Sequence, residues 1–408
     1  MKKIFCKHPA LYLYILGFIV AAAAILFLRT PLSTANLDVD ELFYFTIAKR
    51  LAAGDFFVDI YRPMGFSTSL AIIYLIAGKN LWITQILLTM LATTRVPLTY
   101  FLAKKIVRKD SVATISALIT AMWPISLFYS ASLYSETITV PLFLLMLTTL
   151  PRKREGNWLL PGALLGILIL FHPMYTLFIP FAFLIIWMEQ GSFKIAVKPI
   201  ALCFLGCAFI ILPWSVIASK KASSFVMISV NQVDALAGSL NPVLIQRGYQ
   251  HQNLKSGKSV WVGPGKWTHE HGYLEKEEEN LPQIEKNALV QKRLLEWVQN
   301  NPKDALYLQT AKLAYLWGIY PLFVGGYKHF IFGNIPILLL LALSLMACYR
   351  FRNEILTLSR LWMPLFFICL VSQISWGSWR YRQSVDICLI ILSTLYLFSS
   401  KPTIREKA

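Results

Sequence analysis

Three carboxylates fall within four positions in the first polar stretch of the chain. They are Asp38, Asp40 and Glu41. Carboxylates this close together suit a general base, or a site for a divalent cation. The spacing also fits a helix start, since Asp38 and Glu41 stand three apart as in a capping box and Gly54 follows at a plausible helix end. Both interpretations can hold together, because a cap leaves Asp40 pointing away from the box pair.

Other charged residues stand near the edges of apolar runs. Arg62, Arg380 and Arg382 can each form paired hydrogen bonds with an oxyanion such as phosphate, although arginines that anchor a helix at the membrane surface look the same in a sequence. Glu136 is the only charge in residues 111–151 and is therefore costly if it is buried. An outer turn would leave it solvated at little cost.

Composition decides what kind of fold holds these residues. Of the 408 residues, 56% are hydrophobic and only 15% are charged, whereas a soluble domain is typically about a quarter charged. The chain is therefore predicted to be an all-α polytopic membrane protein. The net charge of +18 comes from short basic clusters between apolar runs, which is typical of cytoplasmic loops and gives no indication of nucleic-acid binding.

Apolar runs predict about ten transmembrane helices. The runs are 9–29, 81–103, 111–129, 132–150, 158–171, 174–188, 196–217, 330–349, 359–379 and 384–400. Two further stretches, 65–78 and 305–324, are predicted to be outward-facing interfacial or re-entrant helices; counting them as spans gives eleven or twelve. Arg95 lies deep in the second run, where it either pairs with a site group or extends toward the membrane surface.

Basic clusters set the expected topology. Those at 2–7, 104–109, 152–154, 194–198, 350–352 and 401–406 are predicted to face the cytoplasm. The segments 30–80 and 218–329 then lie outside, and so does a hairpin over 376–382. This gives three parts: a membrane module over 1–217 that includes the first outer segment, the outer loop over 218–329, and C-terminal transmembrane helices over 330–408.

The outer loop has one clear element. Ile284, Leu295 and Val298 share one face of an amphipathic helix predicted over about 283–300. Neither G-x-G-x-x-G nor a P-loop occurs in the chain, so a water-soluble nucleotide-sugar has no obvious binding site. A sugar carried on a lipid could instead enter sideways between the spans.

The sequence resembles C-type (GT-C) glycosyltransferases in several places. Its 40–54 stretch and the following 62–66 stretch resemble the first outer loop of the family 39-like branch, which includes protein O-mannosyltransferases and the aminoarabinose transferase of lipid A. Further resemblances follow in chain order: Gln85, 124–136, Leu212-Pro213-Trp214, 296–302 and Arg380-Tyr381-Arg382. Together they extend over nearly the whole chain.

The resemblance implies a reaction. A sugar on a polyprenyl phosphate would be transferred to an acceptor hydroxyl on the outer, periplasmic face of a bacterial inner membrane, by inverting displacement at the anomeric carbon. Asp40 would be the base, Glu41 a helper and Asp38 the fallback. No cofactor is certain; if a divalent cation is used, Asp38 and Asp40 are its expected ligands.

The resemblance also implies binding roles. Arg62, Arg380 and Arg382 would hold the donor phosphate, while Glu136 and His172 would orient the acceptor, which is a glycolipid, a glycan or a protein. His172 stands where relatives often have Arg, which would weaken a cationic contact or make it pH-dependent. The alternative from a different class is a lipid flippase or transporter with an outward carboxylate site.

Overall fold

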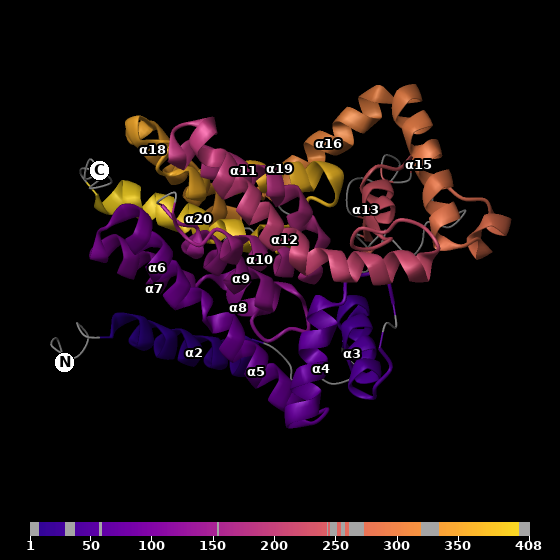
Figure 1. The fold of residues 1–408 in the computed structure, drawn as a ribbon, viewed down its shortest axis with the longest axis horizontal. Helices are drawn as coiled ribbons and strands as arrows, with labels where there is room; N and C mark the ends of the chain where they lie inside the picture. Colours follow the sequence, from indigo (N-terminus) through magenta and orange to yellow (C-terminus); the bar gives the residue numbers. More distant parts are fainter. Residues whose placement is uncertain are drawn as a thin grey trace.

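The computed structural model describes most of the chain (Figure 1). The described residues are 8–28, 37–56, 59–152, 155–242, 244, 251–253, 258–260, 273–319 and 334–399. The predicted basic clusters at 2–7 and 401–406, with Lys153 and Arg154, lie outside the described residues. So do parts of the predicted stretches 305–324 and 330–349.

The described chain is helical apart from one short hairpin. The helices in chain order are α2 (Pro9–Leu28), α3 (Val39–Ala52), α4 (Gly65–Ala77), α5 (Leu81–Thr93), α6 (Arg95–Val107), α7 (Asp110–Ala121), α8 (Pro124–Tyr129), α9 (Glu136–Thr149), α10 (Leu159–Phe171), η1 (Pro173–Phe178), α11 (Ile179–Gln190), α12 (Phe193–Ala222), α13 (Gln232–Ser239), η3 (Lys276–Asn280), α15 (Gln283–Asn300), α16 (Pro302–Leu316), α18 (Ile335–Arg350), η5 (Arg352–Glu354), α19 (Ser359–Ile374) and α20 (Trp379–Phe398). In the hairpin, β1 (His251–Asn253) pairs antiparallel with β2 (Lys258–Val260). This confirms the predicted all-α class.

Each of the ten predicted apolar runs contains a helix. Five helical segments of the described chain are long and apolar enough to cross a membrane, and six shorter apolar helices accompany them. The five are Pro9–Leu26, Leu81–Val107, Pro173–Gln190, Phe193–Ala222 and Trp379–Phe398. The chain is thus a multi-pass membrane protein.

The last run begins earlier than predicted. Helix α20 starts at Trp379, not at 384, because the Ser378 side chain caps it by accepting a hydrogen bond from the Arg380 backbone N–H at 3.2 Å. Arg380 and Arg382 therefore lie on the first turns of a helix, and the connection predicted over 376–382 is confined to residues 375–378.

Helices α10 and α12 approach each other closely. A Cβ atom built on Gly162 would fall well inside van der Waals contact of the Cys203 carbonyl, and one on Gly206 would do the same at the Leu159 carbonyl. Only glycine lets the two backbones pack this tightly. We call the contact of α10 and α12 at Gly162 and Gly206 the glycine seam.

The helices of the two segments that are predicted to lie outside gather at one end of the bundle. Helices α3, α4, α13 and α15 lie at the end opposite to the start of α2 and the finish of α20 (Figure 1). The amphipathic helix predicted over about 283–300 is α15, Gln283–Asn300, and its bounds are confirmed. The residues that could do chemistry must therefore meet where these helices reach the bundle.

Helix α3 begins as the sequence predicts. The Glu41 backbone N–H donates to Asp38 Oδ1 at 2.9 Å and the Asp38 N–H donates to Glu41 Oε2 at 3.4 Å, which confirms the capping box. The helix ends beside Gly54, which adopts φ +88°, a conformation that glycine reaches without strain. The cap fixes where the first turn of α3 points.

Candidate active site

Asp40 is held between two arginines from distant parts of the chain. Arg62 Nη2 donates to Asp40 Oδ1 at 2.7 Å, and Arg380 Nη1 donates to Asp40 Oδ2 at 2.7 Å. Asp40 lies on the first turn of α3, Arg62 just before α4 and Arg380 on the first turn of α20. The Asp40 side chain remains 26% exposed, so the cluster is accessible at this end of the bundle.

Arg380 joins this carboxylate to a second one. Its Nε donates to Glu136 Oε1 at 2.5 Å, and the Glu136 side chain is only 2% exposed. Glu136 is the first residue of α9, so its side chain enters the bundle where the prediction has a solvated turn. Of the two interpretations of Glu136, the solvated turn is wrong, and the ion pair with Arg380 compensates its burial.

Aromatic rings cover the faces of both guanidinium groups. The Arg380 guanidinium lies 4.1 Å from the centroid of the Tyr134 ring, and the Arg62 guanidinium lies 4.8 Å from that of Phe43. Stacked in this way, each guanidinium directs its N–H edges at carboxylates and its faces at rings. In the free protein both guanidinium groups are therefore directed at the carboxylates.

The arginines control the ionisation of Asp40. Burial alone would raise the pKa of Asp40, but the guanidinium groups of Arg380 and Arg62 outweigh it and hold that pKa well below its usual range. The pKa of Arg62 is raised, since the attraction of Asp40 outweighs its burial. Asp40 is thus ionised throughout the physiological range.

Asp38 and Glu41 make different contacts in the structure. Glu41 is 2% exposed, and besides capping α3 its Oε1 accepts from the Leu133 backbone N–H at 3.1 Å. It thus ties α3 to the turn that leads into Glu136. Burial raises the pKa of Asp38, partly offset by its hydrogen bond from the Glu41 N–H.

The carboxylates do not fit a resident divalent cation as they stand. Among the described residues, no group of three or more His, Cys, Asp and Glu side chains could hold a metal ion. Both oxygens of Asp40 also accept from guanidinium groups, whose positive charge would repel a cation. Asp40 therefore acts as the anionic partner of the two arginines, and Asp38 acts as the cap of α3.

His172 lies beside the cluster at the end of α10. Its Nδ1 accepts from the Met174 backbone N–H at 3.3 Å, and its ring lies edge-on to Tyr381 with centroids 5.2 Å apart. Burial lowers the pKa of His172 to about 4, so the ring is neutral near pH 7. It can donate a hydrogen bond through Nε2 but supplies no positive charge.

Arg382 does not belong to the cluster. Its Nε donates to Asp386 Oδ1 at 2.7 Å inside the bundle, its Nη1 donates to the Leu316 carbonyl, and Asp386 Oδ2 accepts from Trp123 Nε1 at 2.9 Å. Two residues along an α-helix differ by about 200° in direction, so Arg380 and Arg382 cannot both face Asp40. The predicted contact of Arg382 with the donor phosphate does not fit this placement.

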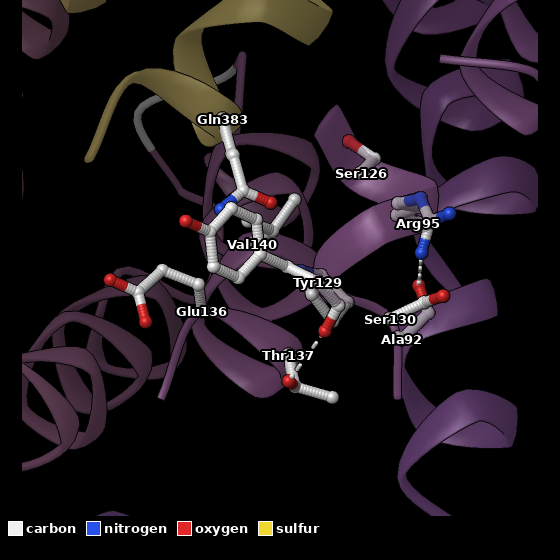
Figure 2. Close-up of a pocket in the computed structure, with 10 residues that line it drawn as sticks. Ala92, Arg95, Ser126, Tyr129, Ser130, Glu136, Thr137, Val140 and Gln383 are labelled. Carbon is white, nitrogen blue, oxygen red and sulfur yellow. Dashed lines mark hydrogen bonds between the residues drawn. The ribbon is translucent and has the colours of Figure 1, made fainter. Parts of the chain in front are cut away.

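A small cavity lies on the inner side of Glu136 (Figure 2). Its volume is about 10 Å³, and its lining includes Arg95, Ser126, Tyr129 and Gln383, which gives room for about one water molecule. Arg95 is 2% exposed, which excludes its extending to the membrane surface. Within the described part of the chain, Arg95 Nε and Ser126 Oγ have no hydrogen-bond partner, and both residues line this cavity.

Sequence comparison gives no match, whereas structure comparison does. A scan against protein-family models and a search of curated proteins both find nothing that matches. The archaeal oligosaccharyltransferase AglB from Archaeoglobus fulgidus, solved with an inhibitory peptide and a dolichol-phosphate, superimposes with a TM-score of 0.56 at 14% identity. The apo form of the Archaeoglobus fulgidus oligosaccharyltransferase gives a TM-score of 0.55 at 13% identity.

These structural matches support an inference about the fold alone. It covers 96% of this chain but 50% of each oligosaccharyltransferase chain, so this chain corresponds to about half of the neighbour's length. AglB is a GT-C glycosyltransferase; the likeness to the family 39-like branch remains a prediction from the sequence. The chain therefore has a multi-pass helical membrane fold of the GT-C type.

Proposed function

We propose that this protein is a membrane glycosyltransferase that moves a sugar from a polyprenyl-phosphate carrier to an acceptor hydroxyl on the outer, periplasmic face of a bacterial inner membrane. The observation that carries the proposal is Asp40 between Arg62 and Arg380. A carboxylate and two oriented guanidinium groups supply the base and the phosphate-binding groups that this transfer needs. The neighbour AglB was solved with a dolichol-phosphate, which supports a lipid-phosphate carrier for this fold.

The two arginines would exchange partners when the donor binds. A phosphate accepts paired hydrogen bonds from guanidinium groups, as Asp40 does in the free protein. Once Arg62 and Arg380 turn to the phosphate, the pKa of Asp40 rises from its depressed value toward its usual range. Asp40 would then be a stronger base with the donor bound than without it, which couples base strength to donor binding.

Transfer then follows as a single displacement. Asp40 takes the proton of the acceptor hydroxyl, while the hydroxyl oxygen forms a bond to the anomeric carbon. The bond from that carbon to the phosphate oxygen breaks, and its electron pair leaves with the phosphate. Arg62 and Arg380 stabilise the charge that develops there. Attack opposite to the leaving phosphate inverts the anomeric centre.

Glu136 and His172 would complete the site from the bundle side. Glu136 keeps Arg380 in place through its 2.5 Å ion pair. The neutral His172 ring, at the edge of the same cluster, can orient a hydroxyl of the acceptor or of the sugar. A glycolipid, a glycan or a protein would each present such a hydroxyl.

The test uses the purified protein in proteoliposomes with a radiolabelled polyprenyl-phosphate sugar and an envelope extract as acceptor. Asp40→Asn should lower sugar transfer by about 10²-fold or more, and Arg62→Met should do the same. Asp55→Asn is the matched control, because Asp55 lies in the same outer segment but pairs with the exposed Arg50. It should transfer at the wild-type rate.

The same vesicles separate the transferase from the flippase. A flippase would move the labelled lipid across the bilayer and leave the sugar on its carrier. A monodisperse Asp40→Asn protein that transfers sugar normally would remove Asp40 from the role of base. Labelled lipid that crosses the bilayer with its sugar still attached would support the transport alternative and contradict the transferase.

A further inference from the structure

The outer helix α13 contacts the segment that carries Arg62. The Tyr61 hydroxyl donates to Asp234 Oδ2 at 3.0 Å, and Tyr61 directly precedes Arg62. One residue earlier, the Ile60 carbonyl accepts from the Val230 N–H at 3.1 Å, just before α13 begins. Two hydrogen bonds, one from a side chain and one from the backbone, thus attach this segment to the start of α13.

The other end of α13 is linked through Lys312 of α16 to the segment that carries Arg380. Lys312 Nζ on α16 donates to Ser239 Oγ at 3.0 Å, and also to the Gln373 carbonyl at 2.8 Å. Gln373 lies at the end of α19, shortly before α20 and Arg380. A Cβ atom on Gly377 would overlap the Lys312 carbonyl, so the connection between α19 and α20 also packs closely against α16.

Both contacts are made by buried ionisable groups. Asp234 is 4% exposed and Lys312 is 0% exposed. Burial raises the pKa of Asp234 to about 6 and lowers that of Lys312 to about 7. Buried groups of this kind are destabilising unless their hydrogen bonds are well made. They therefore specify one arrangement of α13, α16 and the two arginine segments.

We propose that α13 positions the two arginines of the site, with Asp234 and Ser239 as its positioning residues. Through Tyr61 and Lys312, one short outer helix fixes how far the Arg62 segment stands from the Arg380 segment. This inference rests on the proposed function, since the separation matters only if both arginines hold one phosphate. A displacement of about 1 Å in such a site can lower a rate by about 10²-fold.

The test measures transfer by Tyr61→Phe, Asp234→Ala and their double variant in the vesicle assay. Each single change should lower kcat by about 10- to 100-fold, and the double variant should be no worse than the singles because both act through one hydrogen bond. Glu285→Gln is the control, because Glu285 is an exposed carboxylate at the start of the neighbouring α15. It should match wild type.

The pH profile separates positioning from mere stability. Tyr61 from the first outer segment and Gln283 and Lys286 from α15 face Asp234. Transfer by the wild type should decline as the pH falls through about 6, because protonated Asp234 accepts more weakly. Asp234→Asn keeps an uncharged oxygen for Tyr61, like that of protonated Asp234. It should therefore transfer at about the level that the wild type reaches on its acid limb, stay above Asp234→Ala and lack this decline.

The outcomes are distinguishable. Two results would overturn the positioning role and leave the proposed function intact. One is that Asp234→Asn transfers no more sugar than Asp234→Ala. The other is that monodisperse Asp234→Asn still loses transfer as the pH falls through about 6, as the wild type does. Additive losses in the double variant would overturn it as well. A wild-type protein that transfers no sugar would overturn the proposed function and this inference with it.

Discussion

Asp40 and Arg380 are joined at 2.7 Å although 340 residues separate them in the chain. The contact brings the start of an outer-segment helix against the start of the last span. Arg380 makes the same kind of contact with Glu136 from a third element. A single guanidinium therefore determines how three parts of the molecule meet.

Replacement of Arg380 by Lys should nearly abolish transfer. A lysine ammonium lacks the planar fork that allows Arg380 to reach Asp40 and Glu136 together, so we expect a loss of about 10²-fold in kcat/KM. The measurement is initial transfer rate against donor concentration. Arg50→Lys, which changes an exposed arginine of the same outer segment, should leave the rate unchanged, and equal rates for both variants would contradict the assignment.

The loss of stability on replacing Glu136 should depend on whether the new side chain keeps an acceptor oxygen. Glu136→Ala leaves the buried Arg380 with one carboxylate less and should destabilise the protein by about 3–5 kcal/mol. Glu136→Gln keeps an acceptor oxygen, so its cost should be about 1–3 kcal/mol. Unfolding in detergent, monitored by intrinsic fluorescence, measures both. Equal costs for the two variants would show that the hydrogen bond contributes nothing.

The ion pairs of Asp40 should affect stability with a defined pH dependence. A carboxyl whose pKa is lowered by folding contributes stability that is complete above its unfolded pKa of about 3.9 and is lost as the pH falls further. The difference in unfolding free energy between wild type and Asp40→Asn should thus be constant from pH 7 to about 4 and shrink below. A difference that already shrinks between pH 7 and 5 would contradict the lowered pKa.

Arg382 should be a structural residue. Arg382→Met leaves Asp386 buried without its cation and should cost about 3–5 kcal/mol, whereas Arg382→Met with Asp386→Asn should recover most of that loss. The folded fraction of the double variant should transfer sugar at the wild-type rate. A folded double variant that has lost donor affinity would instead return Arg382 to the phosphate site.

The glycine seam should tolerate no side chain. Gly162→Ala forces a methyl group into the Cys203 carbonyl and should destabilise by about 3 kcal/mol or more. Gly191→Ala makes a useful comparison, because Gly191 has φ +72° but open space around its Cβ position. Its cost should be backbone strain alone, about 1–2 kcal/mol. Thermal unfolding of both variants checks the order.

Local features were predictable from the sequence. The capping box of Asp38 and Glu41 and the amphipathic α15 depend on residues within one or a few turns of each other, and both are confirmed. The all-α membrane class follows from composition, because backbone groups in hydrocarbon must be paired within helices or barrels. Nothing long-range is needed for these inferences.

Long-range contacts escaped prediction. The burial of Glu136 depends on Arg380, which hydropathy cannot pair with it across 244 positions. The sequence places Arg382 with Arg380 on the outer side, at the entrance of the last apolar run, whereas Ser378 starts the helix ahead of both. The link from Tyr61 to Asp234 spans 173 positions. Sequence periodicity holds no information on such distances.

Helix α20 fixes one side of the site to the interior of the protein. From Arg382 to Leu395 every residue of α20 is buried. A movement of the helix start that carries Arg380 would therefore disturb the packing of fourteen side chains. Arg62 stands on a short connection whose preceding residues, Ile60 and Tyr61, are held by hydrogen bonds to Val230 and Asp234. The two stretches of backbone that carry the arginines are therefore anchored by different means, and only the side chains of Arg62 and Arg380 are left to move when a donor binds.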